Sequence, residues 1–323
     1  MNKIVVVGSS NTDMTVCSER FPESGQTLLG GEFMMSQGGK GANQAVAIAR
    51  LGGEVTFVAK VGDDMFGRES RKLYAKEGID TDYVFVDGQT PSGVALINVN
   101  AEGENRIVVA SGANYTITRD DIDRAAEVIA RADIVLMQLE SPIECVEHAA
   151  EIASRGGAKV ILNPAPAAEI PVTLYDKLYA IVPNQTEASA LSGVEIVDRQ
   201  SAERAAEVLA SRGVEVVIIT LGSEGALVYE HGHATVVDAL KVRAIDTTAA
   251  GDTFCGGLCV ALSEGRSVCE AVRFATRCSA ISVTRHGAQP SIPYRREVEP
   301  QQEPADNADR GVTAIPRAAV AEA

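Results

Sequence analysis

The segment Ala244–Phe254 carries the strongest chemical signal in the sequence. It reads Ala-Ile-Asp-Thr-Thr-Ala-Ala-Gly-Asp-Thr-Phe and leads from a predicted strand end through small residues into a predicted helix. Amides of Ala249, Ala250 and Gly251 would be unpaired at the helix start. Together with the positive end of the helix dipole, these amides would bind an anion such as a phosphoryl group in transfer.

Asp252 follows this small-residue turn directly. A carboxylate beside an anion hole can accept the proton of an alcohol while the amides hold the phosphoryl oxygens that the alcohol attacks. An aspartate in the first turn of a helix is also favoured by the dipole alone, and its position leaves both roles open. The combination of carboxylate and anion hole favours phosphoryl transfer, with Asp252 as the general base.

A second glycine-rich segment spans Gln37–Gln44 and precedes a predicted amphipathic helix. It is not a Walker A motif, because Gly41 and Ala42 follow Lys40 where that motif has Ser or Thr. A turn that merely joins a strand to a helix is one interpretation. In the other, Lys40 and Asn43 hydrogen-bond a polar, uncharged ligand such as a polyol.

Polar residues also follow several predicted strands. They are the segment Gly8–Asp13 after the first strand, Glu140, and the segment Asn184–Glu187. Ligands bind at the carboxyl ends of strands in open α/β sheets, so we expect these residues at one edge. Each could instead be a local turn or a helix cap. The segment Thr220–Gly225 joins two predicted strands and has the composition of a plain hairpin.

Short β-branched runs alternate with longer Ala- and Leu-rich segments along most of the chain, which predicts an α/β fold with a mostly parallel sheet flanked by helices. The predicted strands are Ile4–Val7, Glu54–Lys60, Tyr83–Val86, Ile134–Met137, Lys159–Leu162, Ala180–Val182, Val214–Thr220 and Ala226–Tyr229. The predicted helices lie near 40–51, 66–77, 119–131, 143–154, 201–211, 251–263 and 267–284.

Two stretches, at about 14–35 and 92–110, break this alternation. They contain strand-like pieces and turn signals without intervening helices, which predicts a small antiparallel sheet inserted into the larger fold. Such a sheet is too small to have its own core, so it must lie over a site as a lid, against a partner subunit, or both.

The composition excludes some classes of partner. The chain has 323 residues with 29 Lys and Arg against 44 Asp and Glu, and the net charge of −15 argues against nucleic acid or an anionic membrane surface. We find no apolar stretch of the roughly 20 residues that a membrane helix needs, and no signal peptide precedes Ile4, so we expect a cytoplasmic protein. Six cysteines without a CxxC pair predict reduced, buried thiols. The acidic composition of 297–323 predicts a flexible tail.

Four segments resemble, in order, the motifs of the ribokinase-like (PfkB) family of carbohydrate kinases. They are Gly38–Asn43, Asn184–Glu187, Asp246–Phe254 and Thr284–Ser291. The resemblance covers about residues 3–294 and implies the family's Rossmann-like fold over 1–296, with the inserted strands as its β lid. It also implies ATP-dependent phosphorylation of the 5-hydroxyl of ribose, with Asp252 as base and the amides of Ala249, Ala250 and Gly251 as anion hole.

The resemblance further assigns binding residues and partners. For the sugar it implies Asn11, Thr12, Asp13, Gly39, Lys40, Gly41, Ala42, Asn43, Glu140 and Asp252. For ATP it implies Asn184, Thr220, Leu221, Gly222, Ser223, Glu224, Gly225, Gly251 and Thr276. A potassium ion would bind oxygens of Asp246, Thr248, Ser282, Arg285, Gly287 and Ser291, and Glu187 would help hold Mg²⁺ through water. The lid commonly pairs two subunits in this family, so we expect a homodimer.

Three alternative functions remain. A kinase of the same family could act on deoxyribose, another sugar or a nucleoside, although Asn11 matches the pattern expected for ribose. A sugar-binding protein without catalysis would be expected to lose Asp252 or the anion-hole turn, and both are present. A dinucleotide-dependent oxidoreductase suits the α/β pattern, but Gly8-Ser-Ser-Asn11 is not GxGxxG.

Overall fold

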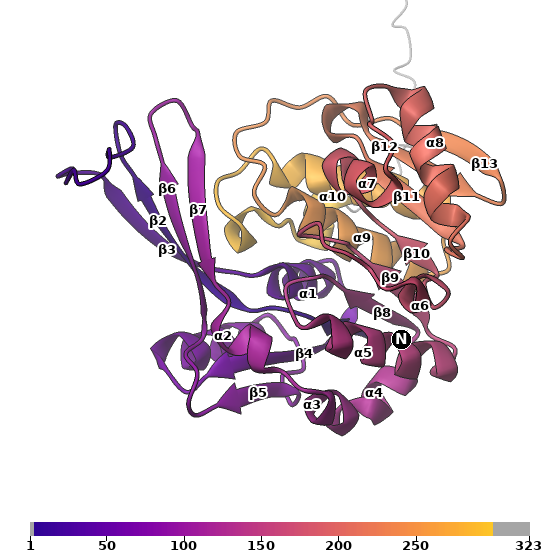
Figure 1. The fold of residues 1–323 in the computed structure, drawn as a ribbon, viewed down its shortest axis with the longest axis horizontal. Coiled ribbons are helices and arrows are strands. Elements are labelled where there is room, and N and C mark those ends of the chain that lie inside the picture. The colour runs from indigo at the N-terminus through magenta and orange to yellow at the C-terminus, as the bar shows by residue number, and fades with distance from the viewer. Residues whose placement is uncertain (1–2, 300–323) are drawn as a thin grey trace, which may run out of the picture.

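The computed structural model describes residues 3–299, which form a large sheet covered by helices and a smaller sheet that extends from it (Figure 1). The large sheet has nine strands in the order β13-β12-β11-β10-β9-β8-β1-β4-β5. Its strands are β1 (Lys3–Val7), β4 (Glu54–Gly62), β5 (Val84–Asp87), β8 (Ile134–Met137), β9 (Lys159–Leu162), β10 (Ala180–Ile181), β11 (Val216–Thr220), β12 (Ala226–Glu230) and β13 (His233–Val237).

Neighbouring strands from β11 to β5 are parallel, and β12 and β13 add an antiparallel edge. The predicted α/β fold with a mostly parallel sheet is therefore confirmed. Strand β13 was not predicted. It lies at the sheet edge, and only Val237 among its residues is buried, so its sequence lacks the apolar run that marks the central strands.

The main helices cover both faces of this sheet. Along β1, Ile4 and Val6 pack in the core that includes residues of α1, α9 and α10, whereas Val5 and Val7 pack in the core that includes α5 and α8. Because both faces are covered, the central strands are continuously apolar rather than alternating. These helices are α1 (Lys40–Arg50), α5 (Ile143–Gly156), α8 (Arg199–Ala210), α9 (Ala250–Ser263) and α10 (Val268–Ser282).

The remaining helices are α2, which was predicted at 66–77, and shorter ones, some of which differ from the prediction. The predicted helix at 119–131 is two helices separated by Ala125, and the helix that begins at Gln185 was expected only as a possible cap. They are α2 (Met65–Lys76), α3 (Arg119–Arg124), α4 (Ala126–Ala130), α6 (Val172–Tyr175), α7 (Gln185–Ser192) and α11 (Arg295–Val298), with 3₁₀ turns η1 (Gly112–Thr116), η2 (Gly222–Glu224) and η3 (Gln289–Ser291).

The smaller sheet consists of β2 (Asn11–Cys17), β3 (Glu32–Gly38), β6 (Gly93–Val99) and β7 (Asn105–Ala110). Its order is β3-β2-β6-β7, with two antiparallel pairs joined by a parallel pairing of β2 and β6. The separate small sheet is confirmed, but its first strand begins at Asn11, before the expected start of the insertion at residue 14. Asn11 and Asp13 are therefore strand residues rather than turn residues.

This small sheet leaves apolar side chains uncovered. Phe33, Met34, Leu96, Ile107 and Val108 are each at least half exposed. In Figure 1 the sheet projects from the helical body, and only the ends of its strands approach the large sheet. The inserted segments thus carry an apolar surface that the described part of the chain does not cover.

The last described residues make ion pairs with earlier parts of the chain. Arg285 pairs with Glu297, and Arg266 pairs with Glu299. The predicted boundary between residues 296 and 297 falls within α11, and residues 300–323 of the predicted tail lie outside the described residues.

The prediction of buried thiols holds for four cysteines and fails for two. Cys145, Cys255, Cys259 and Cys278 are buried and free, whereas Cys17 and Cys269 are free but only partly buried. Cys17 ends a strand of the small sheet, which has little cover.

No helix within residues 3–299 is long and apolar enough to cross a membrane.

Candidate active site

Helix α9 begins with a turn that leaves amides free. Its N-cap, Ala249, has φ 57°, a left-handed conformation that costs energy for a residue with a side chain. The amides of Ala249 and Gly251 have no acceptor among residues 3–299. The expectation for Ala250 was wrong, because its amide donates to the carbonyl oxygen of Thr247 at 3.2 Å. Two of the three predicted anion-hole amides are thus free.

Asp252 lies in the first turn of α9 and is 6% exposed. Its Oδ2 accepts from Nδ2 of Asn43 at 2.9 Å, and its Oδ1 accepts from Nε2 of Gln44 at 3.0 Å. Burial raises the pKa of Asp252, although the charge of Lys40 and these two hydrogen bonds oppose the rise. The structure therefore joins Asp252 to the Gly38–Asn43 segment, some 200 residues away in sequence.

The Gly38–Asn43 segment passes from β3 into α1 through Gly39, whose φ is 87°. A Cβ at this position would lie 2.7 Å from the backbone nitrogen of Asn11, so a glycine is required there. The first amide of the helix, that of Lys40, donates to Oε2 of Glu140 at 3.0 Å, and Ser9 donates to the same oxygen at 2.5 Å. Glu140 thereby stabilises the start of α1.

Lys40 is the cation of this region. Burial lowers the pKa of Lys40, but the charges of Asp252, Glu140 and Glu187 outweigh that effect and raise it. The Lys40 ammonium is therefore protonated at neutral pH and lies among three carboxylates. A charged donor in such a place can bind a hydroxyl or a phosphoryl oxygen.

Asn11, Thr12 and Asp13 begin strand β2 beside this segment. Oδ1 of Asn11 accepts from Nδ2 of Asn114 at 2.7 Å, which fixes the Asn11 amide. Oγ1 of Thr12 and Oδ1 of Asn43 are buried and have no partner among the described residues. Buried polar atoms are normally paired, so these two atoms indicate room for a polar ligand or water.

Asp13 is held near two other carboxylates. Burial and the charges of Glu140 and Asp252 raise the pKa of Asp13 to about 6. A Cβ at Gly38 would overlap with the Asp13 carboxylate, so the backbone of β3 lies against that side chain. The residues predicted to bind the sugar thus form one connected group of polar side chains and backbone. They are Asn11, Thr12, Asp13, Glu140 and the Gly39–Asn43 segment.

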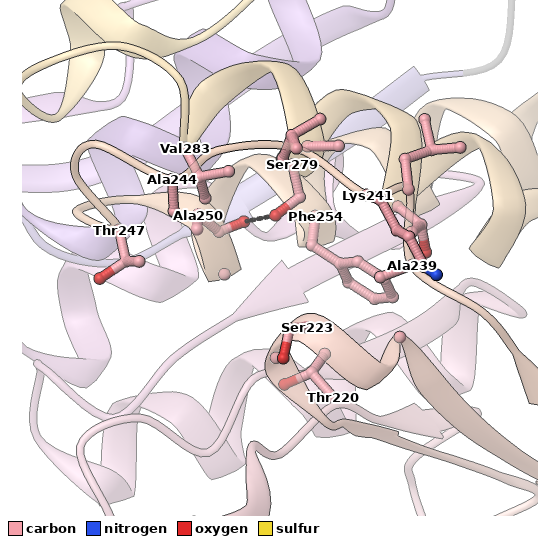
Figure 2. A pocket seen from close by; sticks show the side chains of 17 residues that line it. Thr220, Ser223, Ala239, Lys241, Ala244, Thr247, Ala250, Phe254, Ser279 and Val283 are labelled. Carbon is pink, nitrogen blue, oxygen red and sulfur yellow. Dashed lines mark hydrogen bonds between the residues drawn. The ribbon is translucent and has the colours of Figure 1, made fainter.

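A cleft of about 580 Å³ lies on the other side of the α9 turn. Figure 2 shows Thr220 and Ser223 on the wall opposite Ala244, Thr247 and Ala250, with the ring of Phe254 extending from α9. The residues lining it are Thr220, Gly222, Ser223, Gly225, Ala239, Leu240, Lys241, Val242, Ala244, Thr247, Ala250, Gly251, Phe254, Thr276, Ser279, Ala280 and Val283.

Most of the predicted nucleotide residues line this cleft. Thr276 is 8% exposed, and its Oγ1 has no partner in the described part of the chain. Leu221 does not line the cleft but packs in the core, and Glu224 lies near Arg199 at 4.0 Å. The remaining predicted residue, Asn184, lines a neighbouring cavity.

That smaller cavity, of about 190 Å³, joins the cleft to the catalytic turn. The two cavities share Thr220, Thr247, Ala250 and Gly251, so they adjoin. The smaller cavity is also lined by Lys40, Asn163, Ala165, Val182, Asn184, Glu187, Ala249, Asp252 and Cys255. A phosphate chain reaching from the cleft to Asp252 would pass the free amides of the turn.

Asn184 and Glu187 form a capping box at the start of α7. The Asn184 side chain accepts from the Glu187 amide at 2.8 Å, and the Glu187 carboxylate accepts from the Asn184 amide at 2.9 Å. The capping interpretation of this motif is correct. Both residues also line the smaller cavity, and burial raises the pKa of Glu187. Capping and a role toward phosphate are compatible.

The residues predicted to hold potassium come together behind the catalytic turn. Asp246 Oδ2 accepts from the Gly287 amide at 2.8 Å, and Asp246 Oδ1 accepts from the amide and hydroxyl of Thr248. The hydroxyls of Ser282 and Ser291 lie 2.9 Å apart. Burial tends to raise the pKa of Asp246, but these hydrogen bonds have the larger combined effect and lower it. The Arg285 side chain pairs outward with Glu297, so only backbone of that residue could contribute.

Sequence analysis missed several residues of the site. Residues 239–242 and Ser279 line the cleft but were not singled out, although Lys241 is charged, and Phe254 was noted only as the end of the Ala244–Phe254 segment. Gln44 was noted only as the end of a motif, and Asn163 not at all. A signal for Asn163 was available, since this polar residue directly follows the apolar strand β9 at the binding edge.

Comparison with known proteins gives close relatives over nearly the whole chain. A family model described as pfkB family carbohydrate kinase matches residues 1–295. Ribokinase of Haemophilus influenzae is 46% identical over 294 residues, which are 91% of this chain and 96% of that protein. Deoxyribokinase of Salmonella typhi is 38% identical over 291 residues, 90% of this chain and 95% of that protein. The solved structure of Arabidopsis thaliana ribokinase, complexed with ribose and ATP, has a TM-score of 0.86 and 33% identity, covering 92% of this chain and 97% of that one.

Proposed function

This chain belongs to the pfkB family of carbohydrate kinases and is a sugar kinase, and from that premise we propose that it transfers the γ-phosphoryl group of ATP to the 5-hydroxyl of ribose. One observation carries the proposal. The buried carboxylate of Asp252 lies beside the free amide of Gly251, between a polar group of residues and a cleft of about 580 Å³.

In the proposed reaction, Asp252 accepts the proton of the 5-hydroxyl as that oxygen attacks the γ-phosphorus. The amides of Ala249 and Gly251 stabilise the charge on the transferring phosphoryl oxygens. The Lys40 ammonium lies near Asp252 and adds positive charge on the same side. The bond between the γ-phosphorus and the bridging oxygen breaks, and ADP leaves with that oxygen.

Asn11, Asp13, Lys40, Asn43 and Glu140 bind the sugar hydroxyls in this proposal. Asn114 occupies Oδ1 of Asn11, so the Asn11 amide presents its NH₂ group to the ligand. A site that hydrogen-bonds a hydroxyl rejects the analogue without it, which favours ribose over deoxyribose. The unpaired atoms of Thr12 and Asn43 support a polar ligand at this place.

ATP occupies the cleft and the smaller cavity in the same proposal. The family resemblance assigns it to Thr220, Gly222, Ser223, Gly225 and Thr276, and these residues line the cleft. The buried, unpaired hydroxyl of Thr276 fits a hydrogen-bonding nucleotide base. The single carboxylate of Glu187 fits a Mg²⁺ ion that retains its waters, and bound Mg²⁺ would neutralise phosphate charge.

A potassium ion is proposed beside Asp246, Thr248, Ser282 and Ser291, with backbone oxygens of Arg285 and Gly287. The carboxylate of Asp246 is ionised at neutral pH, and the hydroxyl oxygen of Thr248 lies beside it, which suits a hard cation. Titration with KCl in sodium-free buffer should raise turnover several-fold. A flat response, with unchanged thermal stability, would remove potassium from the proposal.

The small sheet is proposed to act as a lid within one catalytic domain, residues 1–296, and to pair two subunits. Its exposed apolar side chains, Phe33, Leu96 and Val108 among them, support a protein partner on that surface. Sedimentation of the wild type and of Val108→Glu tests this, since a dimer through the lid should dissociate in the variant.

We also propose a cytoplasmic location, because six free thiols suit a reducing compartment, and cell fractionation tests that point.

The central experiment is an ADP-release assay across ribose, deoxyribose, fructose and several nucleosides. The proposal predicts the highest kcat/KM for ribose, with the product phosphorylated at the 5-hydroxyl by ³¹P NMR. Deoxyribose is the second candidate, because a deoxyribokinase is 38% identical to this chain. Higher kcat/KM for deoxyribose would replace ribose as the substrate, and release of ADP without sugar phosphate would contradict both.

A further inference from the structure

Three buried amide side chains form a hydrogen-bonded network behind Asp252. Nε2 of Gln138 donates to Oε1 of Gln44 at 2.5 Å, and Nε2 of Gln44 donates both to Oδ1 of Asn163 at 3.1 Å and to Oδ1 of Asp252 at 3.0 Å. Gln44 and Gln138 are fully buried, and Asn163 is 8% exposed. Gln138 and Asn163 directly follow the neighbouring strands β8 and β9, and Gln44 lies in α1.

A backbone carbonyl determines the orientation of the whole network. Nδ2 of Asn163 donates to the carbonyl oxygen of Val182 at 2.9 Å, and a carbonyl oxygen can only accept. Oδ1 of Asn163 must therefore face Gln44, which has to turn its NH₂ group toward it. The Oε1 atom of Gln44 then faces Gln138, whose NH₂ group donates to it. Each amide is fixed by the next, so Gln44 presents an N–H to Asp252.

We propose that Gln44 is a positioning residue for Asp252, and that Gln138 and Asn163 fix the amide orientation that lets Gln44 hold the carboxylate. This inference rests on the proposed function, in which Asp252 is the general base. It adds the residues that keep this base ionised and directed although it is buried. None of the three lies in the four motifs as a sugar or nucleotide residue.

The surroundings of Asp252 explain why it needs such a donor. The charged and titratable groups that act on it are Lys40 of α1, Glu140 after β8, Asp13 of β2, Glu187 of α7 and Cys255 of α9. Lys40 is the one cation among them. Burial and the neighbouring carboxylates favour the protonated acid, whereas N–H donors favour the carboxylate. Removing Gln44 should therefore raise the pKa of Asp252.

The packing around Gln138 supports a fixed network. A Cβ at Gly8, directly after β1, would overlap with Oε1 of Gln138. That oxygen has no hydrogen-bond partner among the described residues. The Oε1 atom of Gln138 is therefore a buried acceptor without a donor within residues 3–299, while the NH₂ group of the same side chain donates to Gln44. An unpaired buried acceptor is unfavourable for stability, which argues that the orientation serves the site.

The test is the pH profile of Gln44→Met, a substitution that keeps the side-chain length and removes both donors. The acid limb of kcat/KM for ribose should move up by about one pH unit, because a donor to the charged form is lost. Activity should then fall by up to about tenfold on the acid limb and recover at higher pH. Asn163→Leu and Gln138→Met should move the limb in the same direction by less. Gln200→Met, on the exposed surface of α8, is the matched control and should leave the profile unchanged.

A second measurement does not depend on turnover. Carbon-13 NMR of the aspartate carboxyls, with Asp252→Asn for assignment, should give a higher pKa for Asp252 in Gln138→Met, which does not contact Asp252 in the hydrogen-bond network. An equal loss of activity at every pH in the variants, with an unchanged Asp252 pKa, would overturn the proposal. Wild-type protein that phosphorylates no sugar would instead contradict the proposed function, while the NMR titration would still decide the role of Gln44.

Discussion

The two ends of the active site differ in the kinds of residue that line them. The sugar end, Asn11, Asp13, Lys40, Asn43 and Glu140, consists of polar side chains tied to one another and to Asp252 by hydrogen bonds and charge. The nucleotide end is the cleft around Thr276, where small and apolar residues such as Ala244 and Phe254 dominate the lining. The first turn of α9 connects the two ends, because Gly251 lines the cleft and Asp252 is bonded to Asn43.

This difference indicates how each end recognises its ligand. Directional hydrogen bonds from fixed side chains discriminate between hydroxyl patterns, and each one left unpaired carries a penalty. A cleft of small residues and backbone recognises shape and tolerates substitution. Substitutions at the sugar end should therefore have large effects on turnover or specificity, and substitutions at the nucleotide end should have small ones.

The largest effect is expected at Asp252, where the two ends meet. Asp252→Asn keeps the shape and can still bond to one amide, but it cannot accept a proton. We expect kcat to fall about 10³-fold, within the range for loss of a general base. Titration calorimetry should give a ribose Kd within about fivefold of the wild type, since the loss concerns the transition state. Turnover close to the wild-type rate would contradict the base assignment.

Asp13 offers a test in which stability and binding change in opposite directions. Burial and the charges of Glu140 and Asp252 raise the pKa of Asp13 from 3.8 to about 6 in the folded protein. Between these values the folded state binds more protons than the unfolded state, so the free energy of unfolding decreases as pH rises from about 4 to 6. The stability that protonation of Asp13 provides is complete below pH 3.8 and lost above about 6.

Asp13→Asn should remove this decrease and make the free protein about 1–2 kcal/mol more stable at pH 7. The same variant loses a charged acceptor for a sugar hydroxyl, so its KM for ribose should rise about 10- to 100-fold, with KM for ATP little changed. Urea unfolding at several pH values and steady-state kinetics give the two results. A variant that is less stable at pH 7 would show that the carboxylate stabilises the fold instead.

The residues of the sugar end were easier to single out in the sequence than those of the nucleotide end, for the same physical reason. Lys40, Asn43 and Asp252 carry their chemistry in their side chains, and glycine at position 39 is required by a φ of 87°. Residues 239–242 contribute mainly shape through small and apolar side chains, and the charged Lys241 among them belongs to no recognised motif, so this segment was not singled out. The central strands were predicted because both faces are covered, and β13 was missed because it is an exposed edge.

Two site predictions failed because backbone hydrogen bonds determine the local structure at those positions. The amide of Ala250 was expected to be free, but the left-handed conformation of Ala249 brings it to the carbonyl of Thr247. Likewise, the start of β2 at Asn11 depends on pairing with Gly38 of β3 and Gly93 of β6, residues distant in sequence. The pairings of β2 form only when segments far apart meet, and the Ala250 contact depends on the backbone conformation of Ala249, so residue patterns revealed neither.

The smallest effect is expected at the nucleotide end, from Thr276→Val. This substitution keeps the volume and removes a buried hydroxyl that has no partner in the described residues, so the free protein should gain about 0.5–1 kcal/mol of stability. If the hydroxyl binds the nucleotide, KM for ATP should rise less than about tenfold, with KM for ribose unchanged.

Ser279→Ala is the matched control in the same cleft. Its hydroxyl already donates to the carbonyl oxygen of Ala250 at 3.0 Å, as Figure 2 shows, so removing it should lower stability and leave KM for ATP within about twofold. Opposite signs of the stability change at two neighbouring hydroxyls would identify Thr276 as a group kept for a ligand. A tenfold or larger rise of KM for ATP in both variants would mean that this end also depends on side-chain hydrogen bonds, and the contrast with the sugar end would not hold.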